Sequence, residues 1–198
     1  MPMTPVKLNG DKLIIGQDVF TTKNIDTLPP ALHPHTIFTP TDDKTVAFFT
    51  KQSEFSNHAP CEFDVNGVKY NSGEQWLMAQ KADLFKDNAT LEKIMNSTDP
   101  VHIKALGRNI QNYKEEVWYK EAPALMQQGL EAKFIQNQKL GTLLKETGTK
   151  LIIEASTDKF WGAGVTLRSK DLFINKAWTG SNTLGKSLMA VREIIKSG

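Results

Sequence analysis

Two opposite charges, Glu74 and Lys81, stand seven residues apart in a segment whose pattern predicts a helix over 72–86. At about 100° per residue, seven positions return to nearly the same face of a helix. The apolar residues expected on either side of that line are Leu77, Met78, Leu84 and Phe85, whereas Trp76, Gln80 and Asp83 are expected to point elsewhere. The buried stripe of this helix is therefore predicted to contain both an amine and a carboxylate.

A charged side chain on a buried face costs several kcal/mol unless something pairs with it. Glu74 and Lys81 are about 10 Å apart along the helix axis, too far for the local pair that four-residue spacing allows. We interpret them as two ends of one site, in which an amine can act as a nucleophile and a carboxylate can move protons. The alternative is that each has a structural partner elsewhere, or that the long side chains reach solvent.

Gly180–Ser187 matches the phosphate-binding pattern G-x-x-x-x-G-K-[ST] in every letter. That loop belongs after the first strand of a βαβ sheet, and here only one helix can follow before Gly198, so we reject the nucleotidase reading. A weaker expectation stays: a Gly-rich turn at a helix start can offer backbone N–H groups to a phosphate or a sugar. The alternative is that Asn182 or Thr183 simply caps the last helix.

A second glycine-rich loop, Asp158–Gly164, places a carboxylate, the ring of Trp161 and two glycines together. Gly162 and Gly164 would permit a ligand to approach the backbone closely, and Trp161 could stack on a base. Packing alone explains many such Trp-Gly turns, so the pattern taken by itself leaves both readings open.

The composition is that of an ordinary globular protein: 198 residues, 39% hydrophobic, 23% charged, with a formal net charge of +2. No apolar run approaches the ~20 residues of a membrane span, and the N-terminus has no signal-peptide pattern. A single cysteine, Cys61, excludes an internal disulfide and predicts a reducing compartment, which we take to be the cytoplasm. The four histidines show no metal-ligand spacing, so we expect neither a metal nor a cofactor.

Local patterns predict a helix-rich α+β fold with a small β-sheet. Residues 1–22 read as a hairpin within an extension over 1–45, of which 23–44 is turn-rich; the main domain is expected over 46–198. The expected strands lie at 46–49, 61–70 (a hairpin with an Asn-Gly turn) and 151–153, and the expected helices at 72–86, 87–96, 99–106, 113–137, 139–146 and 184–196. Pro123 is expected to break the long segment in two.

Several motifs in one order resemble the YbiA-like NADAR family over roughly residues 46–196. They are Phe55-Ser-Asn57, Glu74, Gln80-Lys81, Leu106-Gly-Arg108, Trp118, Leu130–Phe134, Thr147-Gly148, Glu154, Asp158, Trp161–Gly164, Trp178 and Gly180–Arg192. The resemblance implies an N-glycosidase that acts on ribosylated nitrogen. Family members cleave ribosylamino-pyrimidine phosphates of the early riboflavin pathway, and others remove ADP-ribose from guanine bases of nucleic acid.

In both substrate types the ribose is attached to an exocyclic amino nitrogen, and such glycosylamines can open to an imine. We therefore expect Lys81, its pKa lowered by desolvation, to attack the anomeric carbon and hold the sugar as a Schiff base. Glu74 would shuttle protons, and Asp158 would orient the ribose or activate water. The rival mechanism passes through an oxocarbenium-like transition state in which Lys81 acts only electrostatically.

The residues expected to bind substrate are Asn57, Arg108, Trp118, Trp161, Gly162, Gly164, Gly180 and Asn182. Our preferred substrate is ADP-ribosylated guanine in nucleic acid, because the extension over 1–45 could enlarge the site and the charge balance does not oppose a nucleic-acid strand. The alternatives are the ribosylamino-pyrimidine phosphate and a module that binds ADP-ribose or NAD without turnover. A module that only binds ADP-ribose or NAD would need no buried amine, which favours an enzyme.

Overall fold

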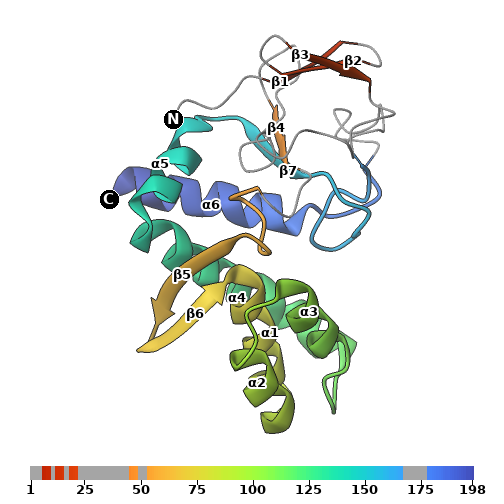
Figure 1. Cartoon of the computed structure of the whole chain (residues 1–198), viewed down its shortest axis with the longest axis vertical. Helices are drawn as coiled ribbons and strands as arrows, with labels where there is room; N and C mark the ends of the chain where they lie inside the picture. The colour runs from red at the N-terminus through yellow and green to blue at the C-terminus, as the bar shows by residue number, and fades with distance from the viewer. Residues whose placement is uncertain (1–5, 10–11, 16–17, 22–44, 49–52, 167–177) are drawn as a thin grey trace. The chain divides into compact units, whose positions relative to one another are not determined.

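Figure 1 shows a computed structural model of the chain, which describes residues 6–9, 12–15, 18–21, 45–48, 53–166 and 178–198. Its contacts divide the chain into two compact units. Unit 1 combines residues 1–56 with 142–198, and unit 2 consists of residues 57–141. This division cuts through the domain expected over 46–198, whose boundary at residue 45 stays a prediction. Each unit is described by itself.

Unit 1 contains an antiparallel sheet at its N-terminal end, formed by β1 (Val6–Asn9), β2 (Lys12–Ile15) and β3 (Asp18–Thr21). Leu8 pairs with Leu13 in the first hairpin, and Leu13 pairs with Phe20 in the second. The expected hairpin is therefore confirmed and gains a third strand. The turn-rich stretch over 23–44 lies outside the described residues.

The rest of unit 1 is built around a parallel pair of buried strands. β4 (Thr45–Phe48) pairs with β7 (Leu151–Glu154), and α6 (Thr183–Ser197) packs against β7. The inward positions expected for the last helix are confirmed, because Leu184, Leu188, Val191 and Ile195 are all buried.

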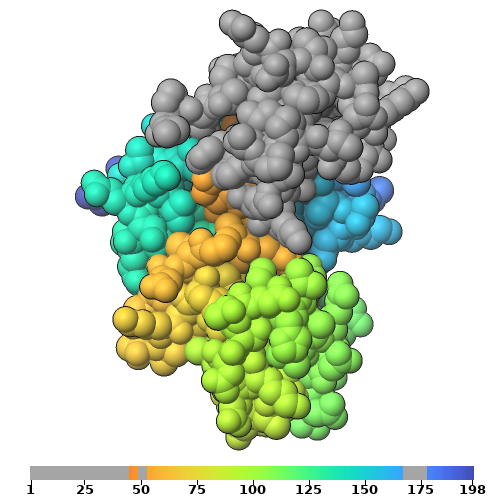
Figure 2. All heavy atoms as spheres, viewed as in Figure 1, coloured from red at the N-terminus to blue at the C-terminus, as the bar shows by residue number. Residues whose placement is uncertain are grey.

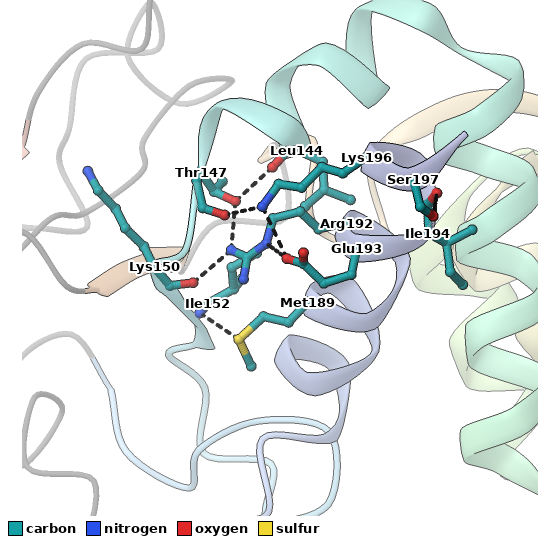
Figure 3. A network of polar contacts seen from close by, with 11 residues as sticks. Leu144, Thr147, Lys150, Ile152, Met189, Arg192, Glu193, Ile194, Lys196 and Ser197 are labelled. Carbon is teal, nitrogen blue, oxygen red and sulfur yellow. Dashed lines mark hydrogen bonds and ion pairs between the residues drawn. The ribbon is translucent and has the colours of Figure 1, made fainter.

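The buried guanidinium of Arg192 joins α6 to the segment that precedes β7 (Figure 3). It donates from one terminal nitrogen to Thr147 Oγ1 at 2.9 Å and to the Lys150 carbonyl at 2.7 Å. Lys196 adds a bond of 2.6 Å to the carbonyl of Gly148, which follows α5 (Gln138–Glu146) and has a φ of +64°. The glycine predicted to end this helix therefore does so in the left-handed conformation that glycine adopts easily.

Unit 2 begins with the hairpin of β5 (Pro60–Val65) and β6 (Val68–Ser72). Asn66 and Gly67 both have positive φ, as the tight turn of a two-residue hairpin requires, so the Asn-Gly prediction is confirmed. Ser72 then caps α1 (Gly73–Leu84) by accepting a bond from the Gln75 backbone N–H at 3.1 Å.

Helix α1 is central to unit 2, since α2 (Asn88–Met95), α3 (Pro100–Arg108), α4 (Glu115–Gln136) and β6 all pack against it. Its residues 73–79 are consequently all buried, and the expectation that Trp76 points away from the core is wrong. The Trp76 indole N–H donates to the Leu125 carbonyl at 2.8 Å, and its ring lies 5.1 Å from that of Tyr70. Asp83 is exposed as expected.

The caps of α2 and α3 follow the predicted pattern. Asp87 accepts from the Thr90 N–H and Asp99 from the Val101 N–H, and Pro100 opens α3. The outer sides of both helices are exposed and form the green surface of Figure 2, which includes a groove lined by Glu92, Asn96, Asp99 and His102.

Pro123 does not break the long helix, so that expectation is wrong as well: α4 is continuous through it. The buried residues Trp118, Ala122, Met126, Leu130 and Phe134 recur at four-residue intervals on both sides of the proline. One continuous packed face therefore holds the helix together although Pro123 cannot donate the usual backbone bond.

Among the described residues, six helices and three small sheets confirm the expected helix-rich α+β class. No helix within these residues has the length and apolar character needed to cross a membrane.

Candidate active site

Lys81 is half-buried near the end of α1, and three groups surround its amine. Nζ donates to the Gly107 carbonyl at 2.8 Å and lies 4.2 Å from the ring centre of Tyr113 and 5.4 Å from that of Trp118. Gly107 makes this approach possible, because a Cβ at that position would lie 2.0 Å from Met78 Sδ. The last turn of α3 can therefore pack directly on α1 and present its carbonyl to the lysine.

Burial lowers the pKa of Lys81 below its ordinary value, and the negative charge of Glu74 opposes this by favouring the ammonium form. The facing aromatic rings also favour the charged form. Because burial has the largest effect, a larger fraction of the amine is neutral at a given pH than for an exposed lysine. A neutral amine is the form that attacks a carbonyl-like carbon.

Glu74 lies in the first turn of α1, and its carboxylate is buried. Its backbone N–H donates to the Asn57 carbonyl at 2.8 Å, and its Oε2 lies 3.4 Å from His58 Nε2. The electrostatic effect of Glu74 on Lys81 indicates that the two charges sense one another across two turns. Both residues lie on α1 in unit 2, Glu74 in its first turn and Lys81 in its last, and that they form one catalytic site stays a prediction.

Asn57 is buried next to the first turn of α1, and its Oδ1 has no hydrogen-bond partner in the structure. Its Nδ2 lies 3.3 Å from the sulfur of Met126. A buried carbonyl oxygen without a donor costs free energy, and the predicted contact of Asn57 with substrate stays a prediction. Arg108 is exposed at the end of α3. Trp118 lies beside the lysine but is buried, so its ring offers a substrate little surface.

The Asp158–Gly164 loop lies in unit 1 and is organised by the Asp158 side chain. Asp158 Oδ1 accepts the backbone N–H groups of Phe160 and Trp161, at 2.8 and 2.7 Å. The half-buried Trp161 ring packs at 4.7 Å, nearly perpendicular, on Phe160. Asp158 therefore has a structural role in the turn, and its predicted catalytic role is untested.

Most of the backbone N–H groups at the start of α6 already have partners, which argues against the interpretation of this turn as a phosphate cradle. The backbone N–H groups of residues 180–184 donate to the carbonyls of Ala163, Lys159, Gly162, Phe160 and Trp161, respectively, at 2.8–3.2 Å. The carbonyls of the glycine-rich loop therefore already accept the backbone N–H groups that would bind a phosphate.

The glycines in these two segments allow one backbone to lie on the other. A Cβ at Gly180 would lie 2.5 Å from the Gly162 carbonyl oxygen, and one at Gly164 would lie 2.6 Å from the Gly180 nitrogen. A Cβ at Gly162 would lie 2.1 Å from the Ser156 hydroxyl. Close packing thus accounts for all three glycines, and a role in binding ligand stays a prediction.

Asn182 occupies the cap position of α6, but its side chain makes no capping bond. Its Oδ1 accepts from the Glu154 N–H at 3.0 Å, and its Nδ2 donates to the Ile152 carbonyl at 2.9 Å. The side chain therefore fixes α6 to β7, and its predicted contact with sugar or phosphate is untested.

Three residues around Lys81 and Glu74 were not predicted as site residues: His58, Gly107 and Tyr113. Gly107 and His58 adjoin Arg108 and Asn57 in the motifs that carried the resemblance, and this adjacency is the signal that could have found them. Tyr113 has no such signal, because only the packing of the turn after α3 brings its ring to Lys81.

The structure thus brings Lys81, Glu74, Asn57 and Trp118 into unit 2 together with the exposed Arg108. It places Asp158, Trp161, Gly162, Gly164, Gly180 and Asn182 in unit 1. Within the parts of the chain that the structure describes, no three His, Cys, Asp or Glu side chains gather in a way that could hold a metal ion.

The model of the NADAR domain family matches residues 41–196. N-glycosidase R617 of Acanthamoeba polyphaga mimivirus is 41% identical over 145 residues, which is 70% of this chain and 85% of the relative. Riboflavin biosynthesis protein VVA0006 of Vibrio vulnificus is 32% identical over 139 residues, covering 70% of this chain but 34% of that longer protein.

The fold is similar to the NMR structure of the E. coli protein YbiA. The two share a TM-score of 0.65 and 27% sequence identity, over 78% of this chain and 86% of the other. The architecture seen in unit 1 and unit 2 is therefore that of a YbiA-like protein.

Proposed function

This chain belongs to the NADAR domain family, and on that premise we propose that it is an N-glycosidase that hydrolyses the bond between ribose and an exocyclic base nitrogen. Our proposed substrate is guanine carrying ADP-ribose in a nucleic-acid strand. The name of the mimiviral relative, an N-glycosidase, supports this class of activity.

The observation that carries the proposal is the state of Lys81. Its amine is half-buried, its pKa is lowered by burial, and a carboxylate that has no direct contact with it lies within electrostatic reach. Nζ donates to a carbonyl and faces two rings, which favour the charged form, but burial has the largest effect on the pKa and lowers it, so a neutral fraction of the amine is available to attack.

In the proposed reaction the bond from the anomeric carbon to the ring oxygen breaks first, as the proton of the base N–H moves to that oxygen and leaves an imine between the sugar and the base. The neutral Lys81 nitrogen then bonds to the anomeric carbon and passes one proton to the base nitrogen, the bond from the carbon to the base nitrogen breaks, and the ring closes again once the sugar leaves Lys81. Glu74 gives the departing amine its proton, and the sugar stays on Lys81 as an imine. Water adds to the imine carbon and gives up a proton, after which the carbon–lysine bond breaks. The products are the free base amine and ADP-ribose, and Lys81 is regenerated.

The choice of ADP-ribosylated guanine over a smaller substrate rests on two features. About forty residues precede the segment that matches the family model and could enlarge the site for a larger substrate. The net charge of +2 is compatible with binding a polyanion such as a nucleic-acid strand. The relative named for riboflavin biosynthesis favours the second candidate, hydrolysis of a ribosylamino-pyrimidine phosphate. Both substrates present the same type of bond to Lys81.

The test is to incubate the parent protein, Lys81→Ala and Lys93→Ala with guanine-ADP-ribosylated DNA and to measure released ADP-ribose. Lys93 is an exposed lysine on α2 and serves as the matched control. We expect release by the parent and by Lys93→Ala, and loss of activity in Lys81→Ala. Release by all three would keep the activity and remove the lysine from its centre.

Two further assays separate the alternatives. Borohydride should trap ADP-ribose on Lys81 of the active parent, and an active enzyme that yields no adduct would favour the oxocarbenium route. If the parent leaves the DNA intact, the ribosylamino-pyrimidine phosphate is tested next. Tight binding of ADP-ribose with no hydrolysis of either compound would instead indicate a module that binds ADP-ribose without turnover.

A further inference from the structure

An imidazole faces the buried carboxylate of the site. His58 Nε2 lies 3.4 Å from Glu74 Oε2, and the side chains of His58 and Glu74 are 18% and 6% exposed, respectively. The Asn57 carbonyl, one residue earlier, accepts the Glu74 N–H at 2.8 Å, so the segment that carries His58 is fixed to the start of α1. The imidazole thus bridges the carboxylate and the surface.

A carboxylate that gives away a proton in each turnover must recover one. Glu74 is almost closed to water, whereas the imidazole beside it is three times as exposed. Imidazole is suited to this transfer, because it takes up and releases protons near neutral pH and has two nitrogens that can act in turn. The negative charge of Glu74 also favours the charged form of Lys81.

We propose that His58 carries protons between solvent and the carboxylate of Glu74. This inference rests on the proposed N-glycosidase function, in which Glu74 is the proton donor. His58 touches no reacting atom and acts through Glu74 as a positioning and relay residue.

The protons balance over one cycle. Glu74 gives its proton to the departing base amine and becomes a carboxylate, and the imidazolium then transfers its Nε2 proton to Oε2. The neutral ring of His58 still carries its Nδ1 proton, so it must turn until the vacant Nε2 takes a proton from solvent, and the water that hydrolyses the imine returns one proton to solvent. No net proton is gained or lost, so the relay determines the route and the rate only.

The experiment measures hydrolysis of guanine-ADP-ribosylated DNA by the parent, His58→Ala, His58→Gln and His102→Ala, with and without added imidazole. His102 is an exposed histidine on α3 that contacts Ser97 and serves as the matched control. A glutamine at position 58 can still donate an N–H to Glu74, but it cannot carry a proton. Melting temperatures show whether each variant folds.

We expect kcat to fall about 100-fold in His58→Ala and in His58→Gln, with little change in KM, since general acid–base groups contribute on that scale. Added imidazole should restore His58→Ala about tenfold, because the truncated side chain leaves space that opens to the surface. A series of substituted imidazoles should rescue in proportion to their basicity, which a purely structural histidine would not produce.

Three results would overturn the relay while leaving the proposed function intact: full activity in His58→Ala, full activity in His58→Gln, or a folded, impaired His58→Ala that imidazole fails to restore. A parent that hydrolyses no N-ribosyl substrate would overturn the proposed function and the relay with it. His102→Ala should match the parent, and a loss there would mean that the assay reports general damage.

Discussion

Replacing Gly107 with alanine tests whether the close approach of α3 to α1 determines the position of the Lys81 amine. The new Cβ would lie 2.0 Å from Met78 Sδ and 2.8 Å from Met78 Cγ. Ordinary contact needs about 3.5–4 Å, so the helices or the methionine must move by more than an ångström. Where the last turn of α3 gives way rather than the Met78 side chain, the Gly107 carbonyl that accepts from Nζ at 2.8 Å moves with it and displaces the amine.

Overpacking on this scale costs about 3 kcal/mol, and the better helix preference of alanine returns up to about 1 kcal/mol. A net loss of about 2 kcal/mol corresponds to a melting temperature lower by about 4–8 °C for a chain of this size. A displacement of about 1 Å can lower kcat about 100-fold. Thermal unfolding and hydrolysis of the guanine-linked substrate measure the two effects.

The matched control is Met78→Ala, alone and combined with Gly107→Ala. The double variant would remove the two closest of these contacts and leave the Cβ of residue 78 at 3.4 Å from the new methyl group. The combined loss of stability should therefore be smaller than the sum of the two single losses by about 1 kcal/mol or more, and kcat should partly recover. Strict additivity, or an unchanged melting temperature in Gly107→Ala, would refute the packing argument.

Three more predictions concern the pH dependence of Lys81 and two polar anchors. Because burial lowers the pKa of Lys81, kcat should rise and level off at a lower pH than an exposed amine would allow, and Lys81→Arg should be inactive. The buried charge of Lys81 destabilises the fold most at a pH below the pKa that the amine has in the folded state. This penalty disappears as the pH rises towards the higher pKa of the unfolded state. Between these two pKa values the free energy of unfolding of the parent, relative to that of Lys81→Met, should therefore increase with pH, as chemical denaturation would reveal. Asn182→Gly should lose about 1–3 kcal/mol with the two bonds to β7, and Asn182→Ala about 1 kcal/mol more, because Asn182 has a φ of +51°; equal losses would contradict the strain argument. Arg192→Lys should lower the melting temperature by several degrees, because one ammonium cannot replace the bonds to Thr147 and Lys150; an unchanged value would show that they contribute little.

Local signals predicted most of the elements, because their causes lie within a few residues. The Asn66-Gly67 turn, the caps Asp87 and Asp99 and the glycine after α5 each act on their own neighbours. Helical periodicity likewise identified the buried face of α6. The two local errors have one physical origin: Pro123 and Trp76 were judged from their own segments, whereas packing by distant elements determined their outcome.

The sequence by itself also identified the Lys81–Glu74 pair, since helical spacing places two charges on one face and the ordered motifs indicate the family. It could not show that the Tyr113 ring and the Gly107 carbonyl surround the amine, or that His58 lies beside the carboxylate. Nor could it show that the loop over 159–163 occupies the N–H groups at the start of α6. Backbone propensity and periodicity act between near neighbours, whereas desolvation and hydrogen-bond partners depend on segments that only the folded chain brings together.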